Sequence, residues 1–149
     1  MKDLSHPKLR NACQAAVLEV LELMFFELPI TTAEVSSAFQ PDSCAASARF
    51  NGSLQGALTV AITRSSCIRL AASLLGLEPD EIDAQNCLST VTELANMLCG
   101  ATISRFEPEG RLHIEQPQSI AASYAPSGHW LTFQLEDGCI SVFIQFQEP

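Results

Sequence analysis

One stretch of the chain decides the fold and the site that the sequence predicts: Ser89-Thr90-Val91-Thr92-Glu93-Leu94-Ala95-Asn96-Met97-Leu98-Cys99-Gly100. In a helix, which turns about 100° per residue, Ser89, Glu93 and Asn96 fall within roughly 60° of one another. The apolar residues fall on the opposite side; they are Leu88, Val91, Leu94, Ala95 and Leu98. The stretch therefore predicts an amphipathic helix that buries an apolar stripe and exposes an acid and an amide together.

Geometry alone leaves an ordinary surface as the alternative, because any amphipathic helix shows polar residues opposite its apolar stripe. Two details favour a functional face. Asn is a mediocre residue inside a helix, and Gly costs ~1 kcal/mol relative to Ala there. Both Asn96 and Gly100 lie on the polar face, where core packing does not require them, and a bare Gly100 would let a partner come close. Ile103 and Phe106 continue the apolar spacing, so the helix is expected to run past Gly100, from about 84 to 104.

Length and composition predict one globular domain, residues 1–149, because 149 residues can bury a proper core and 47% of them are hydrophobic. The net charge of −9 makes nucleic acid an unexpected partner and disfavours anionic membrane surfaces. Only 17% of the residues are charged, which suggests that a partner covers part of the surface. No membrane-spanning segment or signal peptide is evident, since three glutamates interrupt the apolar run at 15–28, and we expect a cytoplasmic protein.

Six cysteines occur without any Cys-x-x-Cys pair, and the absence of a secretory context predicts free thiols rather than disulfides. His6, His113 and His129 lack metal-ligand spacing, and each is expected at the surface or at a strand edge. We therefore expect no metal site and no cofactor of the chain's own. The chain also lacks a Gly-x-Gly-x-x-Gly motif, a P-loop and a Gly-x-Ser-x-Gly motif, so nucleotide binding and a hydrolase nucleophile elbow have no support. A Cys–His nucleophile stays open, but nothing marks one cysteine over the others.

Periodicity predicts the order helix, two strands, two helices, three strands. A first helix is expected from Leu9 to about Phe26, with Ser5 as a possible cap and with Phe25 and Phe26 packed into the core. The expected strands are 45–50, 54–62, 113–120, 130–135 and 139–146; Asn51-Gly52-Ser53 and Asp137-Gly138 are hairpin turns. The second helix is expected from a cap at Ser65 or Ser66 to Gly76. This pattern is α/β in content (α+β), with a largely antiparallel sheet and helices packed on one face.

The acidic segment 77–83 allows two interpretations. Negative charge is favourable at a helix N-terminus, so we expect the segment to cap the following helix. A calcium loop is the alternative, but the spacing of oxygen ligands and the central glycine of an EF-hand are absent.

The pattern Ser89-x-x-x-Glu93-x-x-Asn96, followed by Gly100, resembles the signature of the CheC/CheX/FliY phosphatases of bacterial chemotaxis. Further likenesses cover most of the chain: Gly56 inside the second strand, Leu75-Gly76, the acidic approach 80–83, Pro117 in the strand after the motif helix, and the terminal hairpin. The first helix carries no second Glu-x-x-Asn, which resembles CheX rather than CheC.

The resemblance implies a homodimer and a phosphatase that removes the aspartyl phosphate from a CheY-type receiver domain, without a covalent intermediate on this chain. Asn96 would orient the attacking water, Glu93 would pair with the receiver's lysine, and Ser89 would be a helper or a plain surface residue. Gly100 would belong to the partner-binding face. The receiver would supply the Mg²⁺.

Two other functions stay open at this point. The chain could be a non-catalytic module of the same fold that binds a receiver or a flagellar switch component. It could also be a small-molecule-binding regulatory domain, which would require a deep apolar pocket and buried Glu93 and Asn96 side chains.

Overall fold

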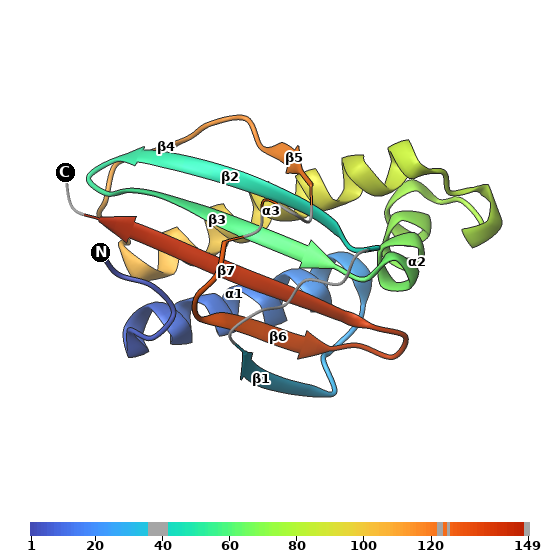
Figure 1. The fold of residues 1–149 in the computed structure, drawn as a ribbon, viewed down its shortest axis with the longest axis horizontal. Helices are drawn as coiled ribbons and strands as arrows, with labels where there is room; N and C mark the ends of the chain where they lie inside the picture. Colours follow the sequence, from blue (N-terminus) through green and yellow to red (C-terminus); the bar gives the residue numbers. More distant parts are fainter. Residues whose placement is uncertain (36–41, 122–123, 125, 148–149) are drawn as a thin grey trace.

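Seven strands form one sheet, and three α-helices lie against one of its faces, in a computed structural model that describes residues 1–35, 42–121, 124 and 126–147 (Figure 1). The strands are β1 (Thr31–Val35), β2 (Cys44–Gly52), β3 (Gln55–Ile62), β4 (Leu112–Ile114), β5 (Gln118–Ile120), β6 (Trp130–Gln134) and β7 (Cys139–Gln147). They lie in the order β1-β6-β7-β3-β2-β4, β5 also pairs with β2, and every pairing is antiparallel. The expected fold class is confirmed.

The helical layer packs on the centre of the sheet. Its members are α1 (Pro7–Phe25), α2 (Arg64–Leu75) and α3 (Ala84–Phe106), and the 3₁₀ turn η1 (Pro79–Glu81) joins α2 to α3. Figure 1 shows α3 behind β2 and β3, with α1 beside it and α2 at one end. No helix in the described part of the chain has the length and apolar character of a membrane span.

Side-chain alternation explains why the sheet needs this layer. Leu58 and Val60 of β3 pair with Ile144 and Val142 of β7, and all four are fully buried on the helical side. Leu94 of α3 is equally buried in the same cluster. Burying side chains of this size contributes roughly 1.5–3 kcal/mol each, so one face of α3 is fixed by packing.

The opposite face of the sheet has a small core of its own. Trp130 and Phe143 are buried there with Ala45 and Ala61, and their rings lie 5.3 Å apart. The Trp130 indole Nε1 donates to the Pro126 carbonyl oxygen at 3.0 Å, which ties the segment before β6 to this face.

The ends of the first two helices differ from the prediction. His6, not Ser5, caps α1, and its Nδ1 accepts from the Leu9 N–H at 3.4 Å. Phe25 is buried as expected, but Phe26 is 89% exposed because it adopts the left-handed conformation that ends the helix.

The α2 cap also differs. Thr63 precedes α2 without a side-chain cap bond, whereas Ser65 and Ser66 lie inside the helix. Their hydroxyls donate instead to the Asp137 carbonyl oxygen and to its carboxylate. Gly76 ends α2 in the left-handed conformation, as predicted.

Two strand predictions need correction. The strand expected at 113–120 is two short strands, β4 and β5, and Pro117 lies between them rather than within a strand. Proline has no N–H to donate, so it cannot continue the ladder with β2. The edge strand β1 was not predicted; all five of its residues pair with β6. Both predicted hairpins are present, between β2 and β3 and between β6 and β7.

Candidate functional site: the polar stripe of α3

A reciprocal cap fixes the start of α3. The Asp83 carboxylate accepts from the Asn86 N–H at 2.7 Å, and the Asn86 side-chain oxygen accepts from the Asp83 N–H at 2.9 Å. Just before it, Glu78 and Glu81 cap η1 in the same manner. The acidic segment therefore caps the helix, as predicted, and sets where the residues of α3 emerge.

The polar stripe lies on the outer side of α3. Ser89, Glu93 and Asn96 are exposed, and Gly100 is half-buried. The residues expected beneath them are buried, with one exception; the buried ones are Val91, Leu94, Ala95 and Leu98. The exception, Leu88, is 37% exposed because it precedes Ser89 by one residue, about 100° around the helix, at the border of the two faces. Gly100 lies well inside the helix, which continues to Phe106.

The two motif side chains are free to meet a partner. Among the described residues, neither the Glu93 carboxylate nor the Asn96 carboxamide makes a hydrogen bond or an ion pair. The neighbouring Thr92, by contrast, has a partner, since its hydroxyl donates to the Leu88 carbonyl oxygen at 2.6 Å. An unpaired carboxylate next to an unpaired carboxamide offers one negative charge, one further acceptor and two N–H donors to an incoming molecule.

Gly100 lies at the rim of a shallow groove between α3 and β4. The groove has a volume of about 170 Å³, and Ser104, Leu112 and Ile114 also line it. A Cβ built at Gly100 would lie 3.7 Å from the Ile114 Cδ1, which is an ordinary contact. The packing of this chain therefore leaves room for a methyl group at position 100.

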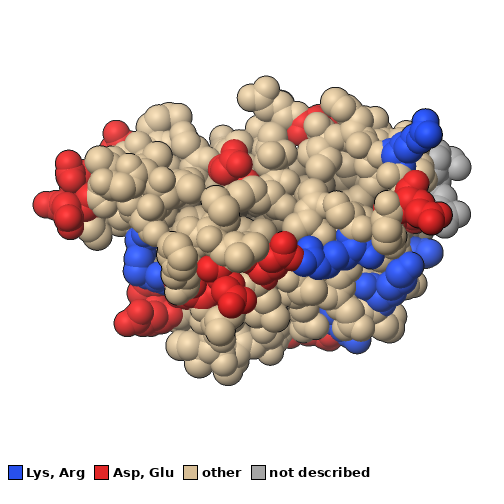
Figure 2. Space-filling view, turned by 180° about the vertical axis from the view of Figure 1, so that it is seen from behind, with Lys and Arg blue, Asp and Glu red and all other residues tan. Residues whose placement is uncertain are grey.

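Few charges surround the stripe. Glu93 is the one acidic residue of α3, and Arg105 in its last turn is the one basic residue. Figure 2 shows the helical face of the molecule, where most Lys and Arg side chains gather at one end and much of the remaining surface is uncharged. The Glu93 carboxylate is thus the one negative charge of α3, which suits a single ionic contact rather than a broad charged interface.

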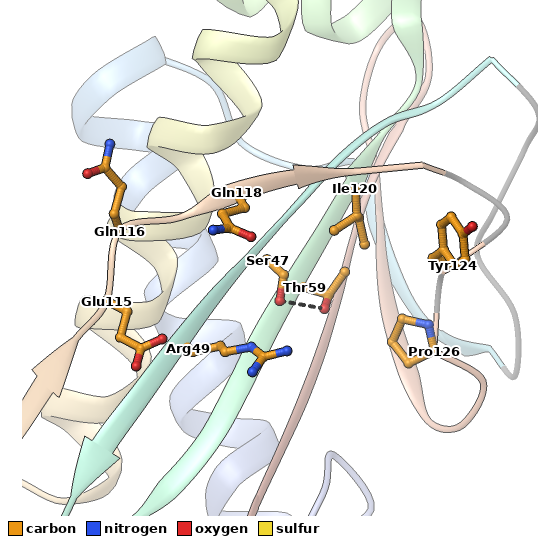
Figure 3. A pocket seen from close by; sticks show the side chains of 9 residues that line it. All are labelled: Ser47, Arg49, Thr59, Glu115, Gln116, Gln118, Ile120, Tyr124 and Pro126. Atoms are coloured by element: carbon orange, nitrogen blue, oxygen red, sulfur yellow. Dashed lines mark hydrogen bonds between the residues drawn. The ribbon is translucent and has the colours of Figure 1, made fainter.

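A larger pocket lies on the other face of the sheet, away from α3. It has a volume of about 480 Å³, and residues of β2, β3 and the β4–β5 segment line it, Arg49, Glu115 and Gln118 among them (Figure 3). Ser47 and Thr59 form its floor, and their hydroxyls lie 3.4 Å apart. This lining is largely polar. A small-molecule-binding domain was expected to have a deep apolar pocket and buried Glu93 and Asn96 side chains. This pocket is polar instead, and both side chains are exposed.

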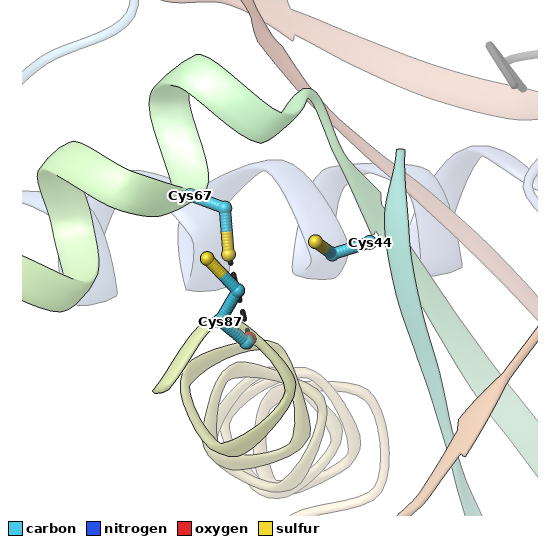
Figure 4. Close-up of side chains that lie close together, drawn as sticks. All are labelled: Cys44, Cys67 and Cys87. Carbon is cyan, nitrogen blue, oxygen red and sulfur yellow. Dashed lines mark hydrogen bonds between the residues drawn. The ribbon is translucent and has the colours of Figure 1, made fainter. Parts of the chain in front are cut away.

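Three cysteines converge where β2, α2 and α3 meet, a cluster that sequence reasoning missed. Cys44, Cys67 and Cys87 are buried, and their sulfur atoms all lie within 4.8 Å of one another (Figure 4). The Cys67 thiol donates to the Cys87 carbonyl oxygen at 3.5 Å. The neighbouring Cys67 thiol, helped by Arg64 and opposed by burial, lowers the pKa of the Cys44 thiol. Each cysteine belongs to a different element, so no spacing in the sequence indicates the cluster. All six cysteines are free, as expected.

Comparison with known proteins identifies the family to which the chain belongs. The family model described as chemotaxis phosphatase CheX matches residues 44–129, more than half of the chain, including the whole of α3. No curated protein matches the sequence.

Several solved structures share the fold at low sequence identity. A chain of the CheX–CheY–BeF3–Mg complex from Borrelia burgdorferi superposes with a TM-score of 0.74 and 18% identity, covering 94% of this chain and 98% of that one. CheX from Vibrio vulnificus superposes with a TM-score of 0.74 and 15% identity, covering 93% of this chain and 99% of that one. FliY from Thermotoga maritima superposes with a TM-score of 0.62 and 12% identity, covering 91% of this chain and 85% of that one. The family match and the shared fold together lead to one conclusion: this chain belongs to the chemotaxis phosphatase CheX family.

Proposed function

We propose that this protein accelerates hydrolysis of the aspartyl phosphate on a CheY-type receiver domain, with the polar stripe of α3 as its working face. The observation that carries the proposal is the exposed, unpaired Glu93–Asn96 pair on a helix whose other face is buried. The family match supports the class of reaction, and a structural neighbour was solved together with CheY and Mg²⁺.

Asn96 is the residue that would touch the reacting atoms. Its carboxamide oxygen accepts a hydrogen bond from the attacking water, and its N–H₂ group can donate to a phosphoryl oxygen. Water attacks phosphorus, the bond between phosphorus and the aspartyl oxygen breaks, and the aspartate leaves as a carboxylate. The water's proton leaves with the phosphate product or passes to solvent. An acyl phosphate is already reactive, so positioning of the water can supply most of the rate gain.

Glu93 would hold the receiver in register. Its carboxylate lies one turn from Asn96 and can pair with a lysine at the receiver's active site. Ser89 lies one turn further along the same stripe and serves either as a second contact or as plain surface. Mg²⁺ would come with the receiver, whose carboxylates suit a hard cation.

Phosphate release from receivers labelled with a small phosphodonor tests the proposal. Asn96→Ala should lower the rate at saturating receiver by on the order of 100-fold. The fold should survive, because Asn96 is exposed and Ala is the better helix former. Asn11→Ala, an exposed asparagine on α1, is the matched control and should leave the rate unchanged. Phosphate release by Asn96→Ala at the parent rate would refute the mechanism.

A second variant separates docking from chemistry. Glu93→Gln should raise the receiver concentration needed for half-maximal rate by about tenfold, the equivalent of ~1.4 kcal/mol, with a smaller effect at saturation. Glu22→Gln on the exposed side of α1 is its control. Receiver binding without faster phosphate release would instead identify a non-catalytic docking module.

The oligomeric state is a separate prediction. We propose a homodimer with one stripe on each protomer, and light scattering of the purified protein measures it directly. A monomer at the concentrations of the assay would contradict the dimer and would leave the hydrolysis proposal standing.

A further inference from the structure

The cysteine cluster has the dimensions of a metal site. Metal–thiolate bonds of about 2.3 Å around a three-coordinate ion put the sulfur atoms roughly 4 Å apart. The sulfur atoms of Cys44, Cys67 and Cys87 already lie within 4.8 Å of one another (Figure 4). Small side-chain rotations therefore suffice to close them on one ion. We propose that these three cysteines form a thiolate site for a soft d¹⁰ metal ion, of which Cu(I) fits best.

The number and kind of ligands select the ion. Among the described residues, no fourth Cys, His, Asp or Glu joins the cluster. Structural zinc takes four protein ligands, and a catalytic zinc with three keeps a water. Cys67 and Cys87 are almost completely buried and Cys44 is 8% exposed, so water has little access. Soft thiolates select Cu(I), which is satisfied by three of them, and Mg²⁺ has no ligand of its kind here.

The surroundings suit the negative charge that thiolates bring. Cys67 and Cys87 are each the fourth residue of a helix. Their backbone N–H groups donate hydrogen bonds to the carbonyl oxygens of Thr63 and Asp83, the residues that precede the two helices. Two helix N-termini thus end beside the cluster, and their dipoles favour anions. Each thiol releases its proton to solvent as its sulfur binds the ion, so binding should strengthen as the pH rises.

An ion at this position would join three elements that are separate along the chain, β2, α2 and α3. Cys44 is the first residue of β2, and Cys87 lies two residues before Ser89 on α3. The ion would therefore fix the start of the helix that carries the polar stripe. Any ligand that binds only the folded state raises its stability, so the bound ion should raise the melting temperature.

Anaerobic titration of the reduced protein with Cu(I), against a competing Cu(I) chelator, tests the site; a parallel titration uses Zn²⁺. We expect one tight equivalent of Cu(I), three sulfur neighbours by X-ray absorption, and a higher melting temperature. Cys44→Ala, Cys67→Ala and Cys87→Ala should each lose the tight equivalent. Cys99→Ala removes an equally buried thiol of α3 outside the cluster and should retain it.

Cys44→Ala decides the test even if the other variants unfold, because Cys44 is the first residue of β2 and Ala replaces it with little loss of volume. Its fold is checked by circular dichroism. Tight Cu(I) binding that survives in folded Cys44→Ala overturns the site. So does the absence of stoichiometric binding to the reduced parent, or a preference for Zn²⁺ over Cu(I). None of these outcomes depends on phosphatase activity.

Discussion

Glu93 and Asn96, the two residues at the centre of the polar stripe, differ in charge. Glu93 is a carboxylate that would repel a phosphoryl group and attract a lysine, whereas Asn96 is neutral and can sit beside the phosphoryl oxygens without repulsion. The sequence predicted their common exposure from spacing alone, because i and i+3 positions share a helix face. What spacing could not predict is that neither side chain has a hydrogen-bond or ion-pair partner among the described residues, since this depends on residues from other elements.

Gly100 gives a test at the same scale. A Cβ at this position meets only the Ile114 Cδ1 at 3.7 Å, so Gly100→Ala should gain helix propensity without a clash. We expect the free energy of unfolding to rise by about 0.5–1 kcal/mol. If a partner approaches this face closely, the added methyl group should also weaken receiver binding.

Chemical unfolding followed by the fluorescence of Trp130, the single and fully buried tryptophan, measures the stability. Receiver binding is measured separately. A more stable variant that binds and turns over the receiver like the parent would remove Gly100 from the partner-binding face.

At the scale of elements, local signals predicted the interior of each helix better than its ends. The α1 stripe and Gly76 after α2 were correct because apolar spacing and a left-handed glycine act within a few residues. The predicted cap at Ser66 was wrong because its hydroxyl donates to the Asp137 carboxylate, 71 positions away in sequence. The strand β1 escaped prediction since its residues are mostly exposed and show no apolar alternation.

The cap of α3 is an element-scale prediction. Asp83→Ala removes the acceptor of the Asn86 N–H and should lower the free energy of unfolding by about 1 kcal/mol. For a chain of this size that corresponds to a fall in melting temperature of about 2–4 °C. Asp80→Ala removes an exposed carboxylate of η1 that caps no helix, and it is the control. Equal melting temperatures for the two variants would contradict the role of the cap.

At the scale of the whole molecule, Arg69 of α2 ties the helical layer to the sheet. Its guanidinium pairs with Glu27 after α1 and with Asp137 in the β6–β7 turn, where the Asp137 carboxylate oxygen lies 2.9 Å away. Hydrogen bonds from Arg69 and Ser66 hold the pKa of Asp137 below its usual value. The stabilisation is therefore present above the ordinary Asp pKa of 3.8 and is lost as the pH falls through the lower folded value.

Asp137→Asn should expose this pH dependence. At pH 7 it should cost about 1 kcal/mol, a modest value because both partners are partly exposed. The difference from the parent should shrink as the pH falls below about 4, when the parent's carboxylate also loses its charge. Unfolding curves at several pH values measure it, with the exposed neighbour variant Glu136→Gln as control. A difference that is constant down to pH 2 would mean that the Asp137 charge contributes nothing.

The centre of the sheet depends on a glycine that the sequence singled out only by resemblance. Gly56 of β3 pairs with Phe50 on one side and Phe146 on the other, and Phe146 packs against Phe106 of α3 with ring centres 5.0 Å apart. A Cβ at Gly56 would overlap the Gln145 carbonyl oxygen and lie 2.7 Å from the Phe146 Cβ. Neither neighbour can move without opening the β3–β7 ladder, because one is backbone and the other is fixed in the core.

Gly56→Ala should therefore lower the free energy of unfolding by about 3 kcal/mol, the size of effect that overpacking produces in a well-filled interior. Gly100→Ala makes the same chemical change where space is available and should shift stability in the opposite direction, so the pair separates steric cost from the loss of glycine's flexibility. Urea unfolding of both variants, followed by Trp130 fluorescence, gives the two values. If Gly56→Ala were as stable as the parent, the close contact between β3 and β7 would have to relax at no cost. The packing of Phe146 against Phe106, which joins α3 to the sheet, would then not depend on the absence of a side chain at position 56.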